Sequence, residues 1–439
     1  MSDVIPEGWG VLPLKDICNA KYGIVDGPFG SNLKTEHYRE SGIPVFQSGF
    51  VTSNRFVKKK YVFVDENKYQ EQIRSSAAPR DILMAKIGMN AGACAIIPDN
   101  HEVGILAGNS LKMTVNQNIA SNNYIANHLH FMQETGGIRR LLTETAQPAI
   151  SITTLKKHIV LLPPLPEQQK IAAILSSVDE VIEKTQAQIN KLKDLKTGMM
   201  QELLSPREGQ AAQINNPQGE SKNSLHHTEF KDSPLGRIPV GWEVAELVEY
   251  LSYISYGFTN PMPNSDEGPL MITAKDVNHL KVQYESARKT TQQAYDELLT
   301  MKSRPKRNDI LLTKDGTLGR VALVDRDNIC INQSVAVLRP NENILPKFLL
   351  YLLAAPSYQR EMLDKAGGSA IKHIYITVVD KMKIAVPNIK EQQKIIKVID
   401  AIFEKLSLSE TKLSDYLNIK KALMQDLLTG KVRVKVDAI

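Results

Sequence analysis

The strongest constraint on this chain is a long, charged segment with a heptad pattern that occurs twice. The first copy runs from Glu167 to Leu204, is preceded by Leu-Pro and ends in MMQELL. The second copy repeats the same EQQKI opening from Glu391 and ends in LMQDLL, 224 residues later in the chain. Apolar residues alternate at spacings of four and three, which predicts a helix with a single apolar stripe. Because both copies must bury such a stripe, we expect them to pack on each other as a coiled coil.

The predicted seam has the same two polar positions in both copies. A hydroxyl falls at Thr185 and Ser409, and a lysine falls at Lys196 and Lys420. The apolar seam positions are Ile171, Leu175, Val178, Ile182, Ile189, Leu192, Met199 and Leu203, matched by Ile395, Ile399, Ile402, Leu406, Leu413, Tyr416, Leu423 and Leu427.

The similarity continues into the segments that precede each helix. Three further pairs of segments match, namely Ile5–Trp9 with Ile238–Trp242, Arg80–Ile97 with Asn308–Val324, and Ile150–Pro164 with Ile374–Asn388. The second of these pairs has two apolar runs around a glycine-bearing turn, which predicts a β-hairpin. Residues 20–78 and 255–305 show no readable similarity. The sequence therefore predicts a tandem duplication of a globular module and a long helix, with a different middle in each module.

This repeat predicts an α+β fold with a pseudo-two-fold arrangement. Two mixed α/β modules would be separated by two long antiparallel helices that form an intramolecular coiled coil. Strand-like and helical runs alternate within the modules, including strands near Val45–Gln47, Tyr61–Val64, Ile82–Lys86, Ala93–Ile97 and Leu111–Val115, and helices near Asn122–Glu134 and Pro346–Leu353. The expected parts are module 1–150, helix region 151–205, linker 206–237, module 238–373, helix region 374–430 and tail 431–439.

Local residues support these boundaries. Pro166 fits the first turn of the first helix, and Asn388 can cap the second. Gly430 suits the position after a helix end. Residues 206–237 are polar and rich in Gln, Asn, Ser, Gly and Pro, which predicts a flexible linker whose His226 and His227 are solvated. Alternating residues in Lys431–Val436 predict a short edge strand.

Composition narrows the cellular setting but leaves the activity open. The chain has 439 residues, a formal net charge of +6 and three scattered cysteines. This is typical of a reduced protein without a disulfide framework or a zinc site. The sequence shows no signal-peptide pattern and no apolar run near the ~20 residues of a membrane span. We therefore expect a cytoplasmic protein.

Catalytic patterns are absent from the sequence. It has no phosphate-binding G-x-x-x-x-G-K-[ST] loop, no H-E-x-x-H zinc pattern and no G-x-S-x-G nucleophile elbow. It also lacks the Asn-Pro-Pro-aromatic run of adenine methyltransferases and a recognisable nuclease core. We expect no catalytic residues, bound cofactor or metal site in this chain.

The order of the repeated segments resembles the DNA specificity subunits of type I restriction–modification systems. The resemblance covers nearly the whole chain and depends most on the run from Gln147 to Ile171, which contains QPAISITTL and PLPEQQKI, followed by a long helix. It implies two target recognition domains that each read half of a split, asymmetric DNA site. It also implies a helical pair that sets the spacer and docks partner subunits.

The same resemblance implies the partners and their cofactors. The expected partners are double-stranded DNA, two methyltransferase subunits and two ATP-dependent restriction subunits, and no membrane. S-adenosylmethionine, ATP and magnesium would belong to those subunits. This chain would supply target selection for adenine methylation and cleavage without being an enzyme itself.

Candidate DNA contacts are basic or amide residues beside strand turns, where they can reach phosphates. They are Lys34, Lys58, Lys59, Lys60, Arg74, Lys86 and Asn90 in the first module, and Lys302, Arg304, Lys306, Arg307, Lys314 and Arg320 in the second. Base readers are expected in the dissimilar loops, at residues 27–32, 46–49 and 255–260.

Two other classes of function remain open from the residues alone. A coiled-coil scaffold would organise partners without sequence-selective DNA binding. A DNA enzyme with an unrecognised active site would methylate or cleave DNA by itself. The different middles of the two modules favour a DNA reader, because a scaffold does not require two different modules.

Overall fold

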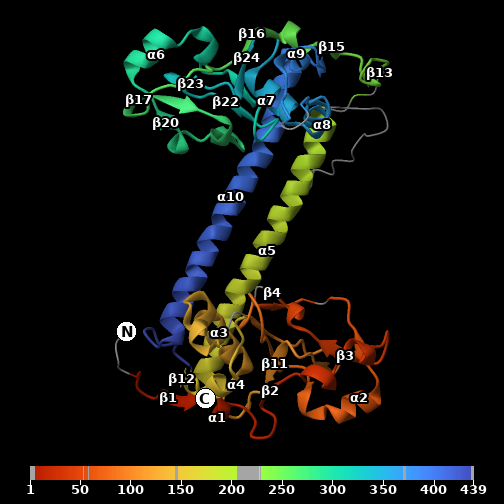
Figure 1. The fold of residues 1–439 in the computed structure, drawn as a ribbon, viewed down its shortest axis with the longest axis vertical. Coiled ribbons are helices and arrows are strands. Elements are labelled where there is room, and N and C mark those ends of the chain that lie inside the picture. Colours follow the sequence, from red (N-terminus) through yellow and green to blue (C-terminus); the bar gives the residue numbers. More distant parts are fainter. Residues whose placement is uncertain are drawn as a thin grey trace. The chain divides into compact units, whose positions relative to one another are not determined.

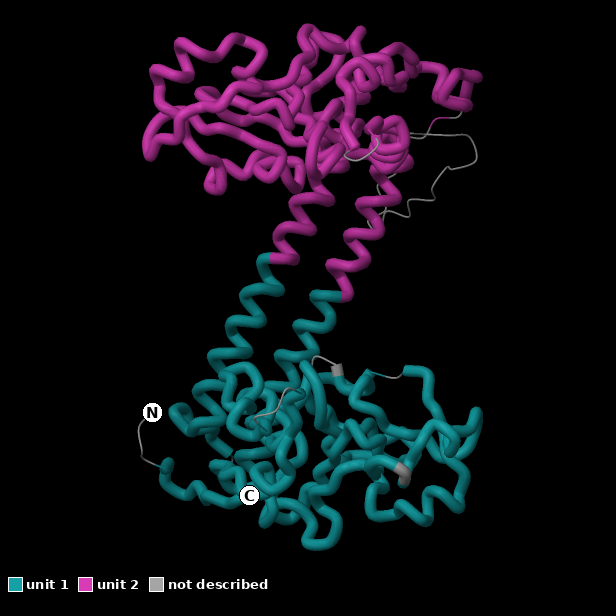
Figure 2. The backbone as a smooth tube through the Cα atoms, in the orientation of Figure 1, with its two compact units in different colours: residues 1–186, 411–439 teal, residues 187–410 magenta. Residues whose placement is uncertain are grey.

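The computed structural model describes residues 5–52, 54–57, 59–143, 147–204, 227, 229–368 and 372–436. It divides into two compact units, shown in Figure 2. Unit 1 consists of residues 1–186 and 411–439, and unit 2 consists of residues 187–410. The division falls within the two long helices, so each helix contributes residues to both units.

The long helices are α5 (Leu165–Leu204) and α10 (Ile389–Leu428), each of 40 residues. Both begin two residues before the predicted start. The backbone N–H of Glu391 donates to Asn388 Oδ1 at 3.1 Å, which confirms the predicted cap. Gly430 follows the end of α10 with φ of +71°, a conformation that favours glycine. The predicted seam residues are all buried or half-buried.

Figure 1 labels β2 and β11 of one sheet of unit 1 and β3 of another. Unit 1 contains two four-stranded sheets with the strand orders β2-β11-β8-β9 and β6-β3-β10-β7. Its elements before α5 are β1 (Gly10–Pro13), α1 (Leu14–Ile17), β2 (Ile24–Asp26), β3 (Ile43–Phe46), β4 (Val51–Thr52), β5 (Arg55–Phe56), β6 (Phe63–Val64), α2 (Glu66–Glu71), β7 (Ser76–Ala77), β8 (Ile82–Ala85), β9 (Cys94–Ile96), β10 (Gly104–Leu106), β11 (Ser110–Met113), α3 (Asn122–Glu134), α4 (Ile152–Lys157) and β12 (Ile159–Leu162).

Unit 2 contains a six-stranded sheet, β16-β24-β21-β22-β19-β18, and a three-stranded sheet, β20-β17-β23. Its elements before α10 are β13 (Phe230–Lys231), β14 (Ile238–Pro239), β15 (Glu243–Glu246), β16 (Leu251–Tyr256), β17 (Ser265–Ile272), β18 (Val277–Asn278), β19 (Leu280–Val282), β20 (Arg288–Lys289), α6 (Gln292–Leu298), β21 (Ile310–Thr313), β22 (Val321–Leu323), β23 (Ile329–Ile331), β24 (Val335–Pro340), α7 (Pro346–Ala354), α8 (Pro356–Asp364), α9 (Ile376–Val379) and β25 (Lys383–Val386).

Several sequence predictions are confirmed and two are wrong. The mixed α/β class, both predicted hairpins (β8–β9 and β21–β22) and the helix Asn122–Glu134 are present. The tail does not form the predicted edge strand, because residues 431–436 have no strand pairing. His227 is not simply solvated, since its Nε2 lies 2.9 Å from Glu391 Oε1. His226 and most of the predicted linker lie outside the described residues, although β13 lies within residues 206–237 and pairs with β14.

The two modules share strand register even where their sequences show no similarity. Strand β11 pairs with β2 so that Leu111 faces Asp26, and β24 pairs with β16 so that Ala336 faces Tyr256. The parallel pair β10–β3 in unit 1 has a counterpart in the parallel pair β23–β17 in unit 2. The dissimilar middles therefore share these strand pairings, although the sheets of the two units differ in their number of strands.

The main core of each unit includes the start of one long helix and the end of the other. In unit 1, Ile171 and Leu175 of α5 join the same apolar cluster as Met424 and Leu427 of α10. In unit 2, the corresponding cluster contains Met199, Met200, Leu203 and Leu204 of α5 and Ile395, Ile399 and Ile402 of α10. Each module is therefore held to both helices by buried apolar surface, which stabilises the contact by about 25 cal/mol per Å².

Within each unit, the helix segments run in opposite directions. In unit 1, Lys420 Nζ of α10 lies 2.7 Å from Asp179 Oδ1 of α5. In unit 2, Lys196 Nζ of α5 lies 4.2 Å from the ring centre of Phe403 on α10. Lys196 and Lys420 are the two repeated seam lysines. The lysine at this position therefore contacts a carboxylate in unit 1 and an aromatic ring in unit 2.

A buried glutamine fixes the first turn of each long helix. In unit 1, Gln168 donates to the carbonyls of Ile119 and Pro163 and accepts from the N–H of Ser121. In unit 2, Gln392 makes the three equivalent hydrogen bonds, as donor to Asn343 and Pro387 and as acceptor from Leu345. Both side chains are at most 1 % exposed. The repeated EQQ sequence thus encodes a polar latch between the long helix and the loop that begins α3 or α7.

The glutamate before each latch contacts a segment that follows the other long helix. Glu167 accepts hydrogen bonds from Arg433 Nε and Nη2 at 2.8 and 2.9 Å, which lower the pKa of its carboxyl group against the raising effect of burial. Glu391 accepts from Trp242 Nε1 at 2.9 Å and lies beside His227.

No helix among the described residues is long and apolar enough to span a membrane.

We predict that Gln168→Ala and Gln392→Ala each lower the free energy of unfolding by roughly 2–4 kcal/mol, because each change leaves buried backbone groups without a partner. Denaturant unfolding would measure the change. Gln169→Ala and Gln393→Ala are matched controls, since these neighbouring side chains are exposed. Equal effects of the buried and exposed substitutions would contradict the latch.

We also predict a pH-dependent contribution from Glu167. Its pKa in the folded protein is lowered from 4.5, so the stabilisation is present above pH 4.5 and is lost as the pH falls through the folded value. Glu167→Gln should flatten the fall in thermal unfolding temperature on acidification below pH 4.5. An unchanged slope would show that the contact with Arg433 contributes no proton linkage.

Candidate nucleic-acid interface

Two clusters, each with two cationic side chains and one central residue, occupy the same three positions in the two modules. We call Asp26, Arg74 and Lys86 the first trio, and Tyr256, Lys302 and Lys314 the second trio. Strand register relates Asp26 to Tyr256, as described above. Lys86 and Lys314 directly follow Ala85 and Thr313, which face equivalent residues of β11 and β24.

The third position of each trio lies in a short 3-10 helix. Arg74 precedes the buried Ser75 in residues 73–75, and Lys302 precedes the buried Ser303 in residues 301–303. Ser75 Oγ donates to the carbonyl of Asp26 at 2.9 Å, which ties this 3-10 helix to the end of β2.

The first trio is centred on a carboxylate. Lys86 Nζ donates to Asp26 Oδ2 at 2.6 Å, and Arg74 Nη2 donates to Asp26 Oδ1 at 2.9 Å. Lys86 Nζ also lies 3.9 Å from the ring centre of the half-exposed Phe29. The side chains of Asp26 and Lys86 are only 11 and 12 % exposed, whereas that of Arg74 is 61 % exposed.

The second trio is centred on an aromatic ring. Lys302 Nζ and Lys314 Nζ lie 4.8 and 5.6 Å from the ring centre of Tyr256. Lys314 also pairs with Asp315 at 2.8 Å, and His373 contacts the same carboxylate. Burial raises the pKa of Asp315, but hydrogen bonds from His373 and Lys314 outweigh burial and lower it overall. Asp315 is therefore ionised at neutral pH.

These clusters fit polyanion binding better than acid–base catalysis. Lysine and arginine provide hydrogen-bond donors to phosphates and base edges, and nearby aromatic rings can contact bases. Within the described residues, no group of three His, Cys, Asp or Glu side chains could hold a metal ion. The loops predicted to read bases at 27–32 and 255–260 lie at the two trios.

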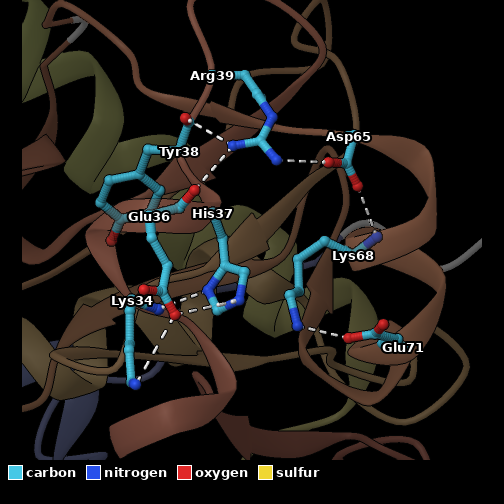
Figure 3. A network of polar contacts seen from close by, with 8 residues as sticks. All are labelled: Lys34, Glu36, His37, Tyr38, Arg39, Asp65, Lys68 and Glu71. Carbon is cyan, nitrogen blue, oxygen red and sulfur yellow. Dashed lines mark hydrogen bonds and ion pairs between the residues drawn. The ribbon is translucent and has the colours of Figure 1, made fainter.

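Other candidates in the first module are more dispersed. Lys34 belongs to a network of charged residues that largely pair with one another, shown in Figure 3. The network comprises Lys34, Glu36, His37, Tyr38, Arg39, Asp65, Lys68 and Glu71. Lys59 and Lys60 are exposed, and Asn90 is exposed in the β8–β9 turn. Lys58 lies outside the described residues.

In the second module, the structure separates the basic residues by role. Arg304 donates to the carbonyl of Asp296 at 2.9 Å and stacks 4.4 Å from the ring centre of Tyr295, so it secures α6. Lys306 and Arg307 are exposed, and Arg320 is half-buried next to β22. Lys302 and Lys314 are the pair that the structure brings together.

Sequence reasoning missed Asp26 and Tyr256, the central residues of the two trios. Both lie in stretches without readable similarity between the modules. An aspartate and a tyrosine give no common signal, and only the register of β2 and β16 reveals their equivalence.

Comparison with known proteins gives a consistent relationship over nearly the whole chain. The family model for the type I restriction modification DNA specificity domain matches residues 6–194 and 263–417. The MjaX specificity subunit of Methanocaldococcus jannaschii is 27 % identical over 443 residues, covering 98 % of this chain and 95 % of that protein. The MjaVIII specificity subunit of the same organism is 24 % identical over 440 residues, covering 98 and 94 %.

A solved structure shows a similar fold. The S subunit of the type I restriction–modification system from M. genitalium superimposes with a TM-score of 0.55 at 14 % identity, covering 98 % of each chain. The family match takes in large parts of both modules and of both long helices. The chain belongs to the type I restriction–modification DNA specificity family.

Proposed function

We propose that this chain selects the DNA target of a type I restriction–modification complex. Each recognition module reads one half of a bipartite, asymmetric site, and the paired long helices set the spacer between the halves. The observation that carries this proposal is the pair of trios: the modules have the same strand register but different side chains at equivalent positions. Two such readers would recognise two different half-sites.

The helices support the role of a spacer. Each unit closes its core around both α5 and α10, so each module is joined to the pair through a packed interface. An α-helix rises 1.5 Å per residue, so 40 residues extend over about 60 Å. Readers with two-fold symmetry engage half-sites separated by one DNA turn, ~34–36 Å, or a multiple of it. In this proposal the helices form an antiparallel coiled coil.

The outer faces of the helices are proposed docking sites for methyltransferase subunits. Leu195, Leu408, Leu417 and Ile419 are large apolar side chains that are 45–57 % exposed on the two helices. These side chains are available for apolar contacts with a partner subunit. Two methyltransferase and two restriction subunits would join the complex.

The chemistry is assigned to those partners. S-adenosylmethionine would be bound by the methyltransferase subunits, and ATP and magnesium by the restriction subunits. The lack of catalytic sequence patterns supports a non-catalytic role for this chain. The relatives named above are likewise called specificity subunits.

Methylome sequencing of cells that express the cognate methyltransferase with and without this chain tests the proposal. A split adenine-methylation motif should appear only when the chain is present. If the chain dimerises or organises the methyltransferase but no motif depends on it, the scaffold function is correct instead.

We predict that replacing residues 1–150 with the first module of another family member changes one half of the methylated motif. The core contacts with residues 171–175 and 424–428 must be kept in the hybrid, because they close unit 1. Exchange of residues 238–373 is the matched control and should change the other half. A change in both halves after a single exchange would contradict separate readers.

We predict that adding one heptad to both helices, after Gln186 in α5 and after Glu410 in α10, lengthens the spacer. Seven residues add about 10.5 Å, the length of roughly three base pairs, while the seam pattern is preserved. Methylome sequencing would measure the spacer. Seven polar residues added after Asn215, between the modules, should leave the spacer unchanged. An unchanged spacer after the helix insertions would refute the role of the helices in setting it.

A further inference from the structure

Arg74 combines exposure with a fixed orientation. Its guanidinium donates to Asp26, a carboxylate that is almost fully covered and that also binds Lys86. The Asp26 main chain is in turn fixed by β2–β11 pairing and by Ser75. The long arginine side chain is therefore restrained at its charged end, although most of its surface remains exposed.

Lys86, the other cation of the first trio, is not exposed to a ligand as Arg74 is. Lys86 is largely covered, its ammonium donates to Asp26, and its remaining surroundings include the Phe29 ring. Arg74 is consequently the member of the trio that can reach a ligand. Lys86 offsets the charge of Asp26, so the trio has a formal net charge of +1 from two cations and one carboxylate.

The position of Asp26 favours a base as the ligand of Arg74. A carboxylate next to a cation weakens the binding of a phosphate to that cation, because the carboxylate and the phosphate are both negative and repel each other. A fixed planar guanidinium, by contrast, gains when the ligand presents two acceptors in one plane, since less rotamer entropy is lost on binding. Guanine presents such a pair, O6 and N7, at its major-groove edge.

We infer that Arg74 reads a guanine in the first half-site and that Asp26 is the positioning residue for this contact. The inference deepens the proposed function and rests on it. In the second trio, Lys302 and Lys314 lie over Tyr256, and the central position holds no carboxylate. The first trio therefore presents a planar guanidinium, and the second presents two ammonium groups over an aromatic ring.

Binding measurements on the purified chain with its methyltransferase test the base contact. After methylome sequencing has identified the motif, each guanine of the first half-site is replaced in turn by 7-deazaguanine, which lacks the N7 acceptor. We expect one replacement to weaken binding of the wild-type complex. Arg74→Ala should weaken cognate binding by roughly 5- to 150-fold and should abolish the sensitivity to that replacement.

The matched control is Arg39→Ala, because Arg39 is also exposed and also pairs with a carboxylate, Asp65, at 3.2 Å (Figure 3). Unlike Asp26, the side chain of Asp65 is 45 % exposed. Arg39→Ala should leave the sensitivity to 7-deazaguanine intact. If Arg74→Ala weakens all duplexes equally and lowers the salt slope by about 1, Arg74 is a phosphate contact and the inference is wrong.

Asp26→Asn tests the positioning role. Removing the carboxylate charge should raise affinity for non-cognate DNA and steepen its salt dependence by up to about 0.9, while the ratio of cognate to non-cognate affinity falls. The rise in non-cognate affinity follows from the loss of a negative charge alone, so the fall in the affinity ratio is the readout of positioning. An unchanged affinity ratio would exclude Asp26 as a positioning residue, and thermal unfolding of each variant verifies that it is folded.

Transplanting the second trio into the first module provides the final test. The double variant Asp26→Tyr, Arg74→Lys leaves Lys86 in place and reproduces the residue types of the second trio. Methylome sequencing should show a change at one position of the first half and none in the second. If the wild-type chain yields no split motif, the proposed function fails. If the motif is present and identical in every Arg74 variant, only the guanine contact fails.

Discussion

Two buried glutamines attach the recognition modules to the long helices. Gln168 and Gln392 each join the first turn of a helix to a preceding proline carbonyl and to the loop that begins α3 or α7. Such groups are costly to bury without partners, so the hydrogen bonds specify one position of the helix against its module. The surrounding apolar clusters supply most of the stabilisation, but they are less directional. The glutamines therefore fix the first turn of each helix against the loop that precedes α3 or α7.

The residues that hold the strands are repeated in the two modules, whereas the central residues of the two trios differ. Asp81 and Asp309 both accept a backbone N–H at the turn before a central strand, from Ala78 and Lys306, respectively. Their charges are balanced from the neighbouring strand, by Lys112 in unit 1 and Arg339 in unit 2. These repeated residues hold the strands in place. The trios, located where strands end, differ in the side chain at the centre, and in the proposed function this difference distinguishes the two half-sites.

The segments predicted correctly from sequence are those with a local or periodic signal. Heptads predicted α5 and α10, apolar runs around glycines predicted the hairpins, and Asn388 predicted a helix cap. Lys431–Val436 shows the limit of such signals. Its alternation suggested a strand, but the described tail residues form no strand pairing, and Arg433 instead binds Glu167. This contact joins the tail to a carboxylate far away in the sequence, and no pattern within the tail encodes it.

The sequence by itself determined the duplication, the paired helices, the family and the basic residues that surround the strand turns. Only the tertiary structure decided which of those residues act together. Asp26, Arg74 and Lys86 are separated by up to 60 residues, and their meeting depends on the pairing of β2 with β11 and of β11 with β8. Strand register is set by long-range contacts, whereas helical periodicity is visible within a short window. For that physical reason the helices could be predicted directly from the sequence, and the two trios could not.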